Sequence, residues 1–85
     1  MPEVSRFYGI VITINFDDHL PPHFHARYGD HRAAIGLEGT VYAGHLPARA
    51  LRLVRAWGVQ HGDELLADWE RARDRRPLVP IAPLD

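Results

Sequence analysis

One short stretch of the chain carries residue types that can do chemistry, Pro21-Pro22-His23-Phe24-His25-Ala26-Arg27-Tyr28. From His23 onward, polar side chains alternate with apolar or aromatic ones, which predicts a β-strand. Successive side chains of a strand point to opposite faces, so His23, His25 and Arg27 share one face. The alternate positions, which we expect in the core, are Phe24, Ala26 and Tyr28. Packing does not require two imidazoles and a guanidinium on an exposed face, so this face is the candidate site.

Three interpretations of the face are open. In the first, His23 and His25 are surface residues of the strand without a special role. In the second they bind a divalent metal, because residues i and i+2 of a strand lie about 6.5–7 Å apart and both imidazoles can reach one ion. A third ligand would come from the neighbouring loops, which contain His19, Asp17, Asp18 and His31. The chain has no cysteine, so a metal site must be rich in histidine. We predict no cofactor, and the alternative is Zn²⁺ or Ni²⁺ at His23, His25 and His19.

In the third interpretation the face cleaves RNA without a metal. A neutral imidazole can accept the proton of a 2′-hydroxyl, a second can protonate the leaving oxygen, and an arginine can stabilise charge on the phosphorus centre. His23, His25 and Arg27 would be the catalytic residues of this ribonuclease-like activity. The next strand carries only Ala34 and Gly36 at the middle of the same face, which would leave a shallow platform for a polymer.

Length and composition restrict the classes of protein to consider. Eighty-five residues form one domain, 1–85, with a thin core of two layers. The formal charge of −1 argues against binding nucleic acid over the whole surface, so any contact with RNA would be local. No apolar run approaches the roughly 20 residues that span a bilayer, and no basic segment leads into an apolar one, so we expect a cytoplasmic protein without a membrane partner.

The elements that must position the candidate face follow from apolar periodicity, glycine and proline. The pattern predicts an α+β fold, with a small antiparallel sheet of three to four strands followed by two helices packed on one face. The predicted strands span about 6–16, 23–28, 32–38 and 41–43, the helices about 47–59 and 63–75, and a proline-rich tail 77–85. Gly9 inside the first strand suggests a bulge. The apolar tail can pack along a sheet edge, or cover a homodimer or partner interface.

The first helix carries a basic stripe on the face opposite its apolar side. The stripe consists of Arg49, Arg52 and Arg55. It is typical of a solvated helix face, and it can also bind phosphate or an acidic partner. His61, between the helices, is interpreted as a helix-end residue that satisfies a carbonyl.

The whole pattern resembles a small bacterial family, domain of unknown function 4160. The resemblance is carried by Ser5-Arg6-Phe7-Tyr8-Gly9-Ile10, Pro21-Pro22-His23-Phe24-His25, Leu46-Pro47, Leu53-Val54, Trp57, His61, Glu64-Leu65 and Trp69. It covers nearly the full chain, and the diproline followed by His-aromatic-His is its most specific part.

The resemblance implies a toxin of a bacterial type II toxin-antitoxin pair, and we expect it to act on RNA or translation through the face of His23, His25 and Arg27. It also implies a small antitoxin partner that resembles domain of unknown function 2442. The alternative class is a non-catalytic module that binds a metal ion or another protein.

Overall fold

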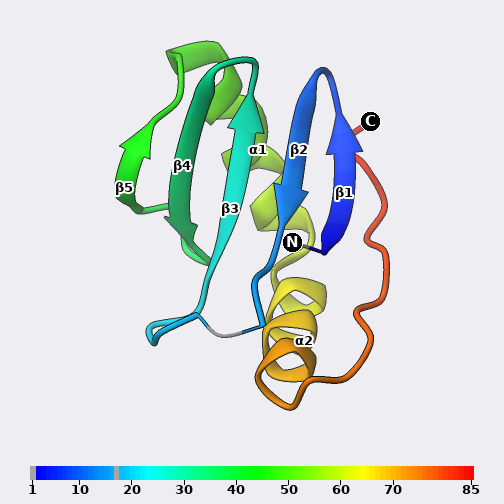
Figure 1. Cartoon of the computed structure of the whole chain (residues 1–85). Coiled ribbons are helices and arrows are strands. Elements are labelled where there is room, and N and C mark those ends of the chain that lie inside the picture. The colour runs from blue at the N-terminus through cyan, green and yellow to red at the C-terminus, as the bar shows by residue number, and fades with distance from the viewer. Residues whose placement is uncertain (1, 17) are drawn as a thin grey trace.

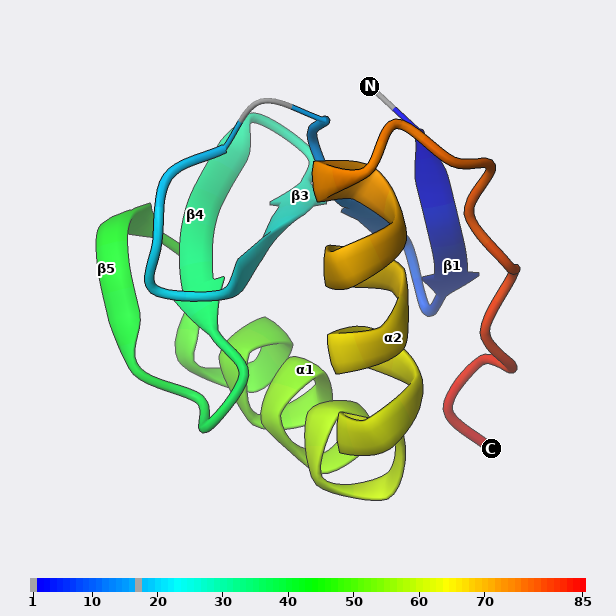
Figure 2. The same ribbon diagram turned by 90° about the horizontal axis from the view of Figure 1, so that it is seen from below.

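The computed structural model describes residues 2–16 and 18–85. In that part of the chain, five antiparallel strands pair in chain order, and two helices follow them. The strands are β1 (Glu3–Phe7), β2 (Ile10–Thr13), β3 (His23–Tyr28), β4 (His31–Gly36) and β5 (Val41–His45), and the helices are α1 (Ala48–Gln60) and α2 (Gly62–Arg73). Both helices lie on one side of the sheet, and the other face is open (Figures 1 and 2). The predicted α+β fold is confirmed.

The prediction of one strand over residues 6–16 is wrong, because that segment is a hairpin. Phe7 of β1 pairs with Ile10 of β2, and the two residues between them have positive φ, 49° at Tyr8 and 81° at Gly9. A two-residue turn with positive φ at both positions matches the twist of the strands that it joins. Gly9 is therefore a turn residue and not a bulge, and the sheet has five strands where three to four were predicted.

The core lies between the sheet and the helices. Strands β2, β3 and β4 contribute alternate apolar residues, as the period of two requires, and the helices contribute Trp57 and Trp69. Trp57 packs against Phe24 of β3 and Phe7 of β1, with ring centroids 5.8 and 5.4 Å apart. The predicted inward face of β3 is confirmed at Phe24 and Ala26, each 1% exposed, while Tyr28 is partly buried against the same cluster.

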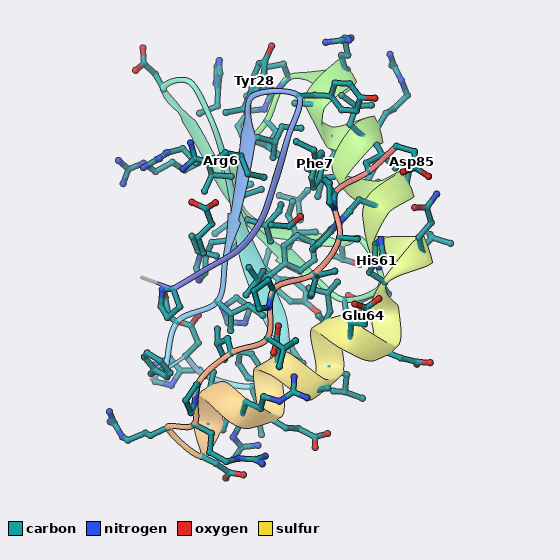
Figure 3. The ribbon with its side chains drawn as sticks, turned by 90° about the vertical axis from the view of Figure 1, so that its right-hand side faces the viewer. Arg6, Phe7, Tyr28, His61, Glu64 and Asp85 are labelled. Carbon is teal, nitrogen blue, oxygen red and sulfur yellow. The ribbon has the colours of Figure 1, made fainter. Side chains whose placement is uncertain are left out.

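The proline-rich tail returns along the outer edge of β1, as Figure 2 shows. The backbone N–H of Ile81 donates to the carbonyl of Val4 at 2.8 Å, and the indole of Trp57 donates to the carbonyl of Ala82 at 2.8 Å. The last residue, Asp85, lies close to α1 (Figure 3). The tail therefore packs along one edge of the sheet within its own chain, which is one of the two predicted alternatives.

None of the helices in the described ranges is long and apolar enough to cross a membrane.

Candidate functional site

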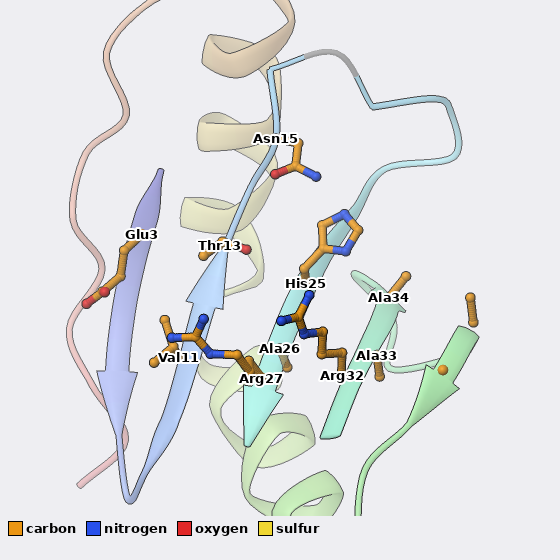
Figure 4. Close-up of a pocket in the computed structure, with 12 residues that line it drawn as sticks. Glu3, Val11, Thr13, Asn15, His25, Ala26, Arg27, Arg32, Ala33 and Ala34 are labelled. Atoms are coloured by element: carbon orange, nitrogen blue, oxygen red, sulfur yellow. The ribbon is translucent and has the colours of Figure 1, made fainter. Parts of the chain in front are cut away.

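The open face of the sheet holds a shallow groove of about 610 Å³. Small side chains of β4 and β5, including Ala34 and Ala43, form part of its lining. The polar residues His25 and Arg27 of β3 stand over it, together with Arg32 of β4 (Figure 4). The predicted platform beside the histidine strand is therefore present over Ala34.

At one end of β3, two histidines converge on one carboxylate. The Nε2 atom of His25 lies 2.8 Å from Oδ2 of Asp18, and Nε2 of His23 lies 3.3 Å from the same oxygen. One ligand atom from each of the three residues lies within 4.8 Å of the others. The side chains of His23, Asp18 and His25 are 13, 19 and 31% exposed, so the cluster is reached from solvent on the side of His25.

The carbonyl of Pro21 fixes the position of one hydrogen on the His23 ring. Its Nδ1 lies 3.0 Å from the carbonyl oxygen of Pro21, and a carbonyl can only accept, so Nδ1 carries a hydrogen and donates it. In a neutral ring the lone pair of Nε2 then points at the Asp18 carboxylate, which also has only lone pairs to offer. The contact becomes favourable when Nε2 gains a proton or when a cation lies between the two atoms.

His25 differs from His23 because one of its ring nitrogens stays available. Without a metal its Nε2 donates a hydrogen to Asp18 at 2.8 Å. No described residue hydrogen-bonds to its Nδ1, which can carry the hydrogen when Nε2 binds an ion. The ring lines the groove, whereas the ring of His23 packs against Trp69 and Tyr42, with centroids 5.2 and 6.3 Å away. His23 is held in place, and His25 connects the cluster with the groove.

Comparison with known proteins identifies the family of the chain. The model described as Domain of unknown function (DUF4160) matches residues 9–70. The chain belongs to this family. The match spans β2 to most of α2, so it includes the whole Asp18-His23-His25 cluster and the arginines of the groove. Comparison with curated proteins and with solved structures gives no match.

In this DUF4160 protein the third member of the cluster is Asp18 and not His19. His19 is exposed and does not belong to the group, although it was the predicted third metal ligand. Asp17, another of the ligands considered, lies outside the described residues. His31 sits at the far end of the β3–β4 hairpin, where its ring faces that of His45 at 5.7 Å.

The helix arginines do not join the site. Arg49, Arg52 and Arg55 belong to α1, which lies on the side of the sheet opposite the groove (Figures 1 and 2). Arg55 donates through Nε to the carbonyl of Gly39 at 3.0 Å and so ties α1 to the turn before β5. This contact gives Arg55 a structural role.

The space over Gly36, which was predicted to be bare, is filled by Tyr42 and Glu38. A Cβ at Gly36 would collide with both side chains. The Tyr42 hydroxyl donates to Glu38 at 2.9 Å, and this bond raises the pKa of Tyr42. The pKa of Glu38 is lowered, first by a hydrogen bond to its own backbone and then by the bond from Tyr42. Gly36 therefore makes room for the tyrosine that packs beside His23.

Two groove residues were not recognised from the sequence as parts of a site. Arg32 is the direct cross-strand partner of Arg27. Asn15 also lines the groove, and its Oδ1 is buried without a hydrogen bond from the described residues. Alternation placed Arg32 on this face, but only the register of the β3–β4 pair sets it opposite Arg27.

Proposed function

We propose that this protein binds a divalent metal ion through Oδ2 of Asp18 and the Nε2 atoms of His23 and His25. A tetrahedral Zn²⁺ ion bound at about 2.0–2.2 Å to nitrogen and oxygen keeps its ligand atoms about 3.3 Å apart. The separation of Asp18 from His23 already has this value, and that from His25 needs to widen by a few tenths of an ångström from 2.8 Å.

The observation that carries the proposal is the hydrogen bond from Nδ1 of His23 to the carbonyl of Pro21. Histidines that bind metal usually donate their other ring N–H to a carbonyl or carboxylate, which fixes the tautomer and directs the lone pair at the ion. His23 has this arrangement, and in a neutral ring the lone pair of its Nε2 faces a carboxylate instead of a donor. A cation removes that repulsion.

The ligand set favours zinc-like chemistry. Two imidazoles and one carboxylate suit Zn²⁺ or Ni²⁺, and three protein ligands leave a position for water, as in catalytic zinc sites. A bound ion of this kind would supply the chemistry of metal-assisted hydrolysis, in which water is activated. His25 would present that position to the groove.

The same geometry favours the metal over the two-histidine mechanism on RNA. That mechanism needs a ring nitrogen free for substrate on each imidazole, and both nitrogens of His23 already face protein oxygens.

The toxin activity and the antitoxin partner stay predictions of the family resemblance. Expression in a bacterial host without the partner is expected to slow growth with the wild-type protein and not with His25→Ala. Unaffected growth with the wild type would contradict the toxin prediction.

Calorimetric titration of Zn²⁺ into chelator-treated protein tests the metal site. We expect one ion per chain, and at least a hundredfold loss of affinity in His23→Gln, because a ligand and its oriented lone pair disappear together. The matched control is His61→Gln, a histidine that also contacts a carboxylate but is expected to keep wild-type affinity. Equal affinity in wild type and His23→Gln would overturn the proposal.

A further inference from the structure

Two arginines that line the groove lie directly opposite each other on neighbouring strands. Arg27 of β3 and Arg32 of β4 are register partners, and both are exposed. Like charges at directly opposite positions of a sheet are destabilising. Neither residue makes a hydrogen bond or an ion pair with a residue in the described part of the chain, in contrast to Arg6, Arg55 and Arg71.

Among the described residues, the one carboxylate that lines the groove is already paired. Glu3 accepts two hydrogen bonds from Arg6, at 2.7 and 3.2 Å. The pKa of Glu3 is lowered chiefly by this pairing, and the charge of Arg27 adds a smaller effect. The groove therefore keeps two guanidinium groups for an anion from outside.

We propose that Arg27 and Arg32 bind the phosphate backbone of single-stranded RNA lying in the groove. The proposal rests on the proposed metal site for its chemistry, and it names the substrate class of that site. Guanidinium groups match phosphate oxygens with paired, charge-assisted hydrogen bonds. Arg27 follows His25 by two residues on the same strand face, about 6.5–7 Å along β3, so a phosphate held by the arginines lies next to the ion.

Asn15 points to RNA over DNA. Its Oδ1 is buried in the groove and accepts no hydrogen bond from the described residues. Because this oxygen is closed to solvent, a ligand in the groove meets the amide nitrogen of Asn15, which can donate a hydrogen bond. The ribose 2′-hydroxyl can accept that bond, and DNA lacks this group.

Fluorescence anisotropy with a labelled ten-nucleotide single-stranded RNA tests the arginines. The protein is kept free of metal by chelator, so binding is measured apart from the metal site. Arg27→Gln and Arg32→Gln are each expected to weaken binding roughly tenfold and to lower the salt slope by about 0.7. The matched control, Arg52→Gln, removes the same charge from α1 on the opposite side and is expected to stay within twofold.

The outcomes separate the possible explanations. An equal loss in Arg52→Gln would show a general charge effect and overturn the proposal, and so would an acidic peptide that competes as well as unlabelled RNA. DNA of the same sequence is expected to bind more weakly than RNA in the wild type and equally in Asn15→Ala. Equal binding of RNA and DNA by the wild type would overturn the role of Asn15.

The two proposals fail separately. Zn²⁺ affinity is expected to be unchanged in Arg27→Gln and Arg32→Gln, which also shows that these variants fold. Zn²⁺ binding without RNA binding would overturn the RNA proposal alone. RNA binding without Zn²⁺ binding would overturn the metal site alone.

Discussion

Two regions of the molecule bring a histidine against a carboxylate, and they differ in what holds the pair together. At the junction of α1 and α2, Nδ1 of His61 lies 2.7 Å from Oε1 of Glu64 (Figure 3). At the beginning of β3, Nε2 of His25 lies 2.8 Å from Oδ2 of Asp18. The distances are nearly equal, so distance alone does not separate a structural pair from a site.

The His61–Glu64 pair is local. His61 precedes the first residue of α2, and Glu64 lies three residues later in its first turn, the spacing at which side chains often meet at a helix start. The backbone N–H of His61 also donates to Trp57, which closes α1. One histidine and one carboxylate therefore satisfy each other and join two helices.

The Asp18 cluster brings two imidazoles to one carboxylate oxygen, and in the neutral form of the His23 ring its Nε2 has no hydrogen to donate there. His23 donates to Pro21, so the cluster lacks one positive charge, which a proton or a metal ion can supply. The two regions differ in charge balance and not in distance. The Asp18 cluster, which lacks one positive charge, is therefore the candidate functional region, whereas the His61–Glu64 contact is not.

Exchanging the two carboxylates for amides gives the largest expected difference between the regions. Asp18→Asn is expected to lower Zn²⁺ affinity at least a hundredfold, because a neutral amide is a poor ligand, whereas Glu64→Gln is expected to leave it within twofold. Asp18→Asn keeps an oxygen that can accept from His25, so the fold should remain. Competition with a chromogenic chelator measures both affinities, and equal values in the two variants would contradict the assignment.

The next largest effect is expected from pH. An imidazole must be neutral to bind a metal, and histidine ordinarily titrates near pH 6.5. With two histidine ligands, lowering the pH from about 7.5 to 5.5 is expected to weaken Zn²⁺ binding roughly a hundredfold. A loss of only about tenfold would indicate one histidine ligand and remove either His23 or His25 from the site.

The smallest effect concerns stability at the helix junction. Glu64 is half exposed, so Glu64→Gln is expected to lower the free energy of unfolding by only about 0.5 kcal/mol. Urea denaturation at neutral pH, followed by circular dichroism, measures the change. A loss above about 2 kcal/mol would mean that the pair does more than join two helices.

Periodicity predicted much of the fold, and its failures have local causes. The bounds of β3 agree with the prediction of 23–28, and α1 and α2 lie within two residues of theirs, because each shows one clear period and a proline or glycine near its ends. The hairpin of β1 and β2 was missed because its turn needs a positive φ at Tyr8. An aromatic residue before a glycine rarely adopts this conformation, so the sequence gives no signal for the turn.

The candidate site was predictable where it depends on one strand and not where it depends on loops or register. His23 and His25 follow from alternation along β3. The choice of Asp18 over His19 depends on the path of the loop after β2, and the Arg27–Arg32 pair depends on how β4 aligns with β3. Neither property is fixed by spacing in the sequence.

The most direct test of the metal site is nitrogen-15 NMR of the histidine rings during Zn²⁺ titration. We predict that one equivalent shifts the Nε2 resonances of His23 and His25, while Nδ1 of His23 keeps its hydrogen and His61 does not change. Shifts at Nδ1 of His23, or at His61 in place of the β3 histidines, would contradict a metal ion held by Asp18, His23 and His25.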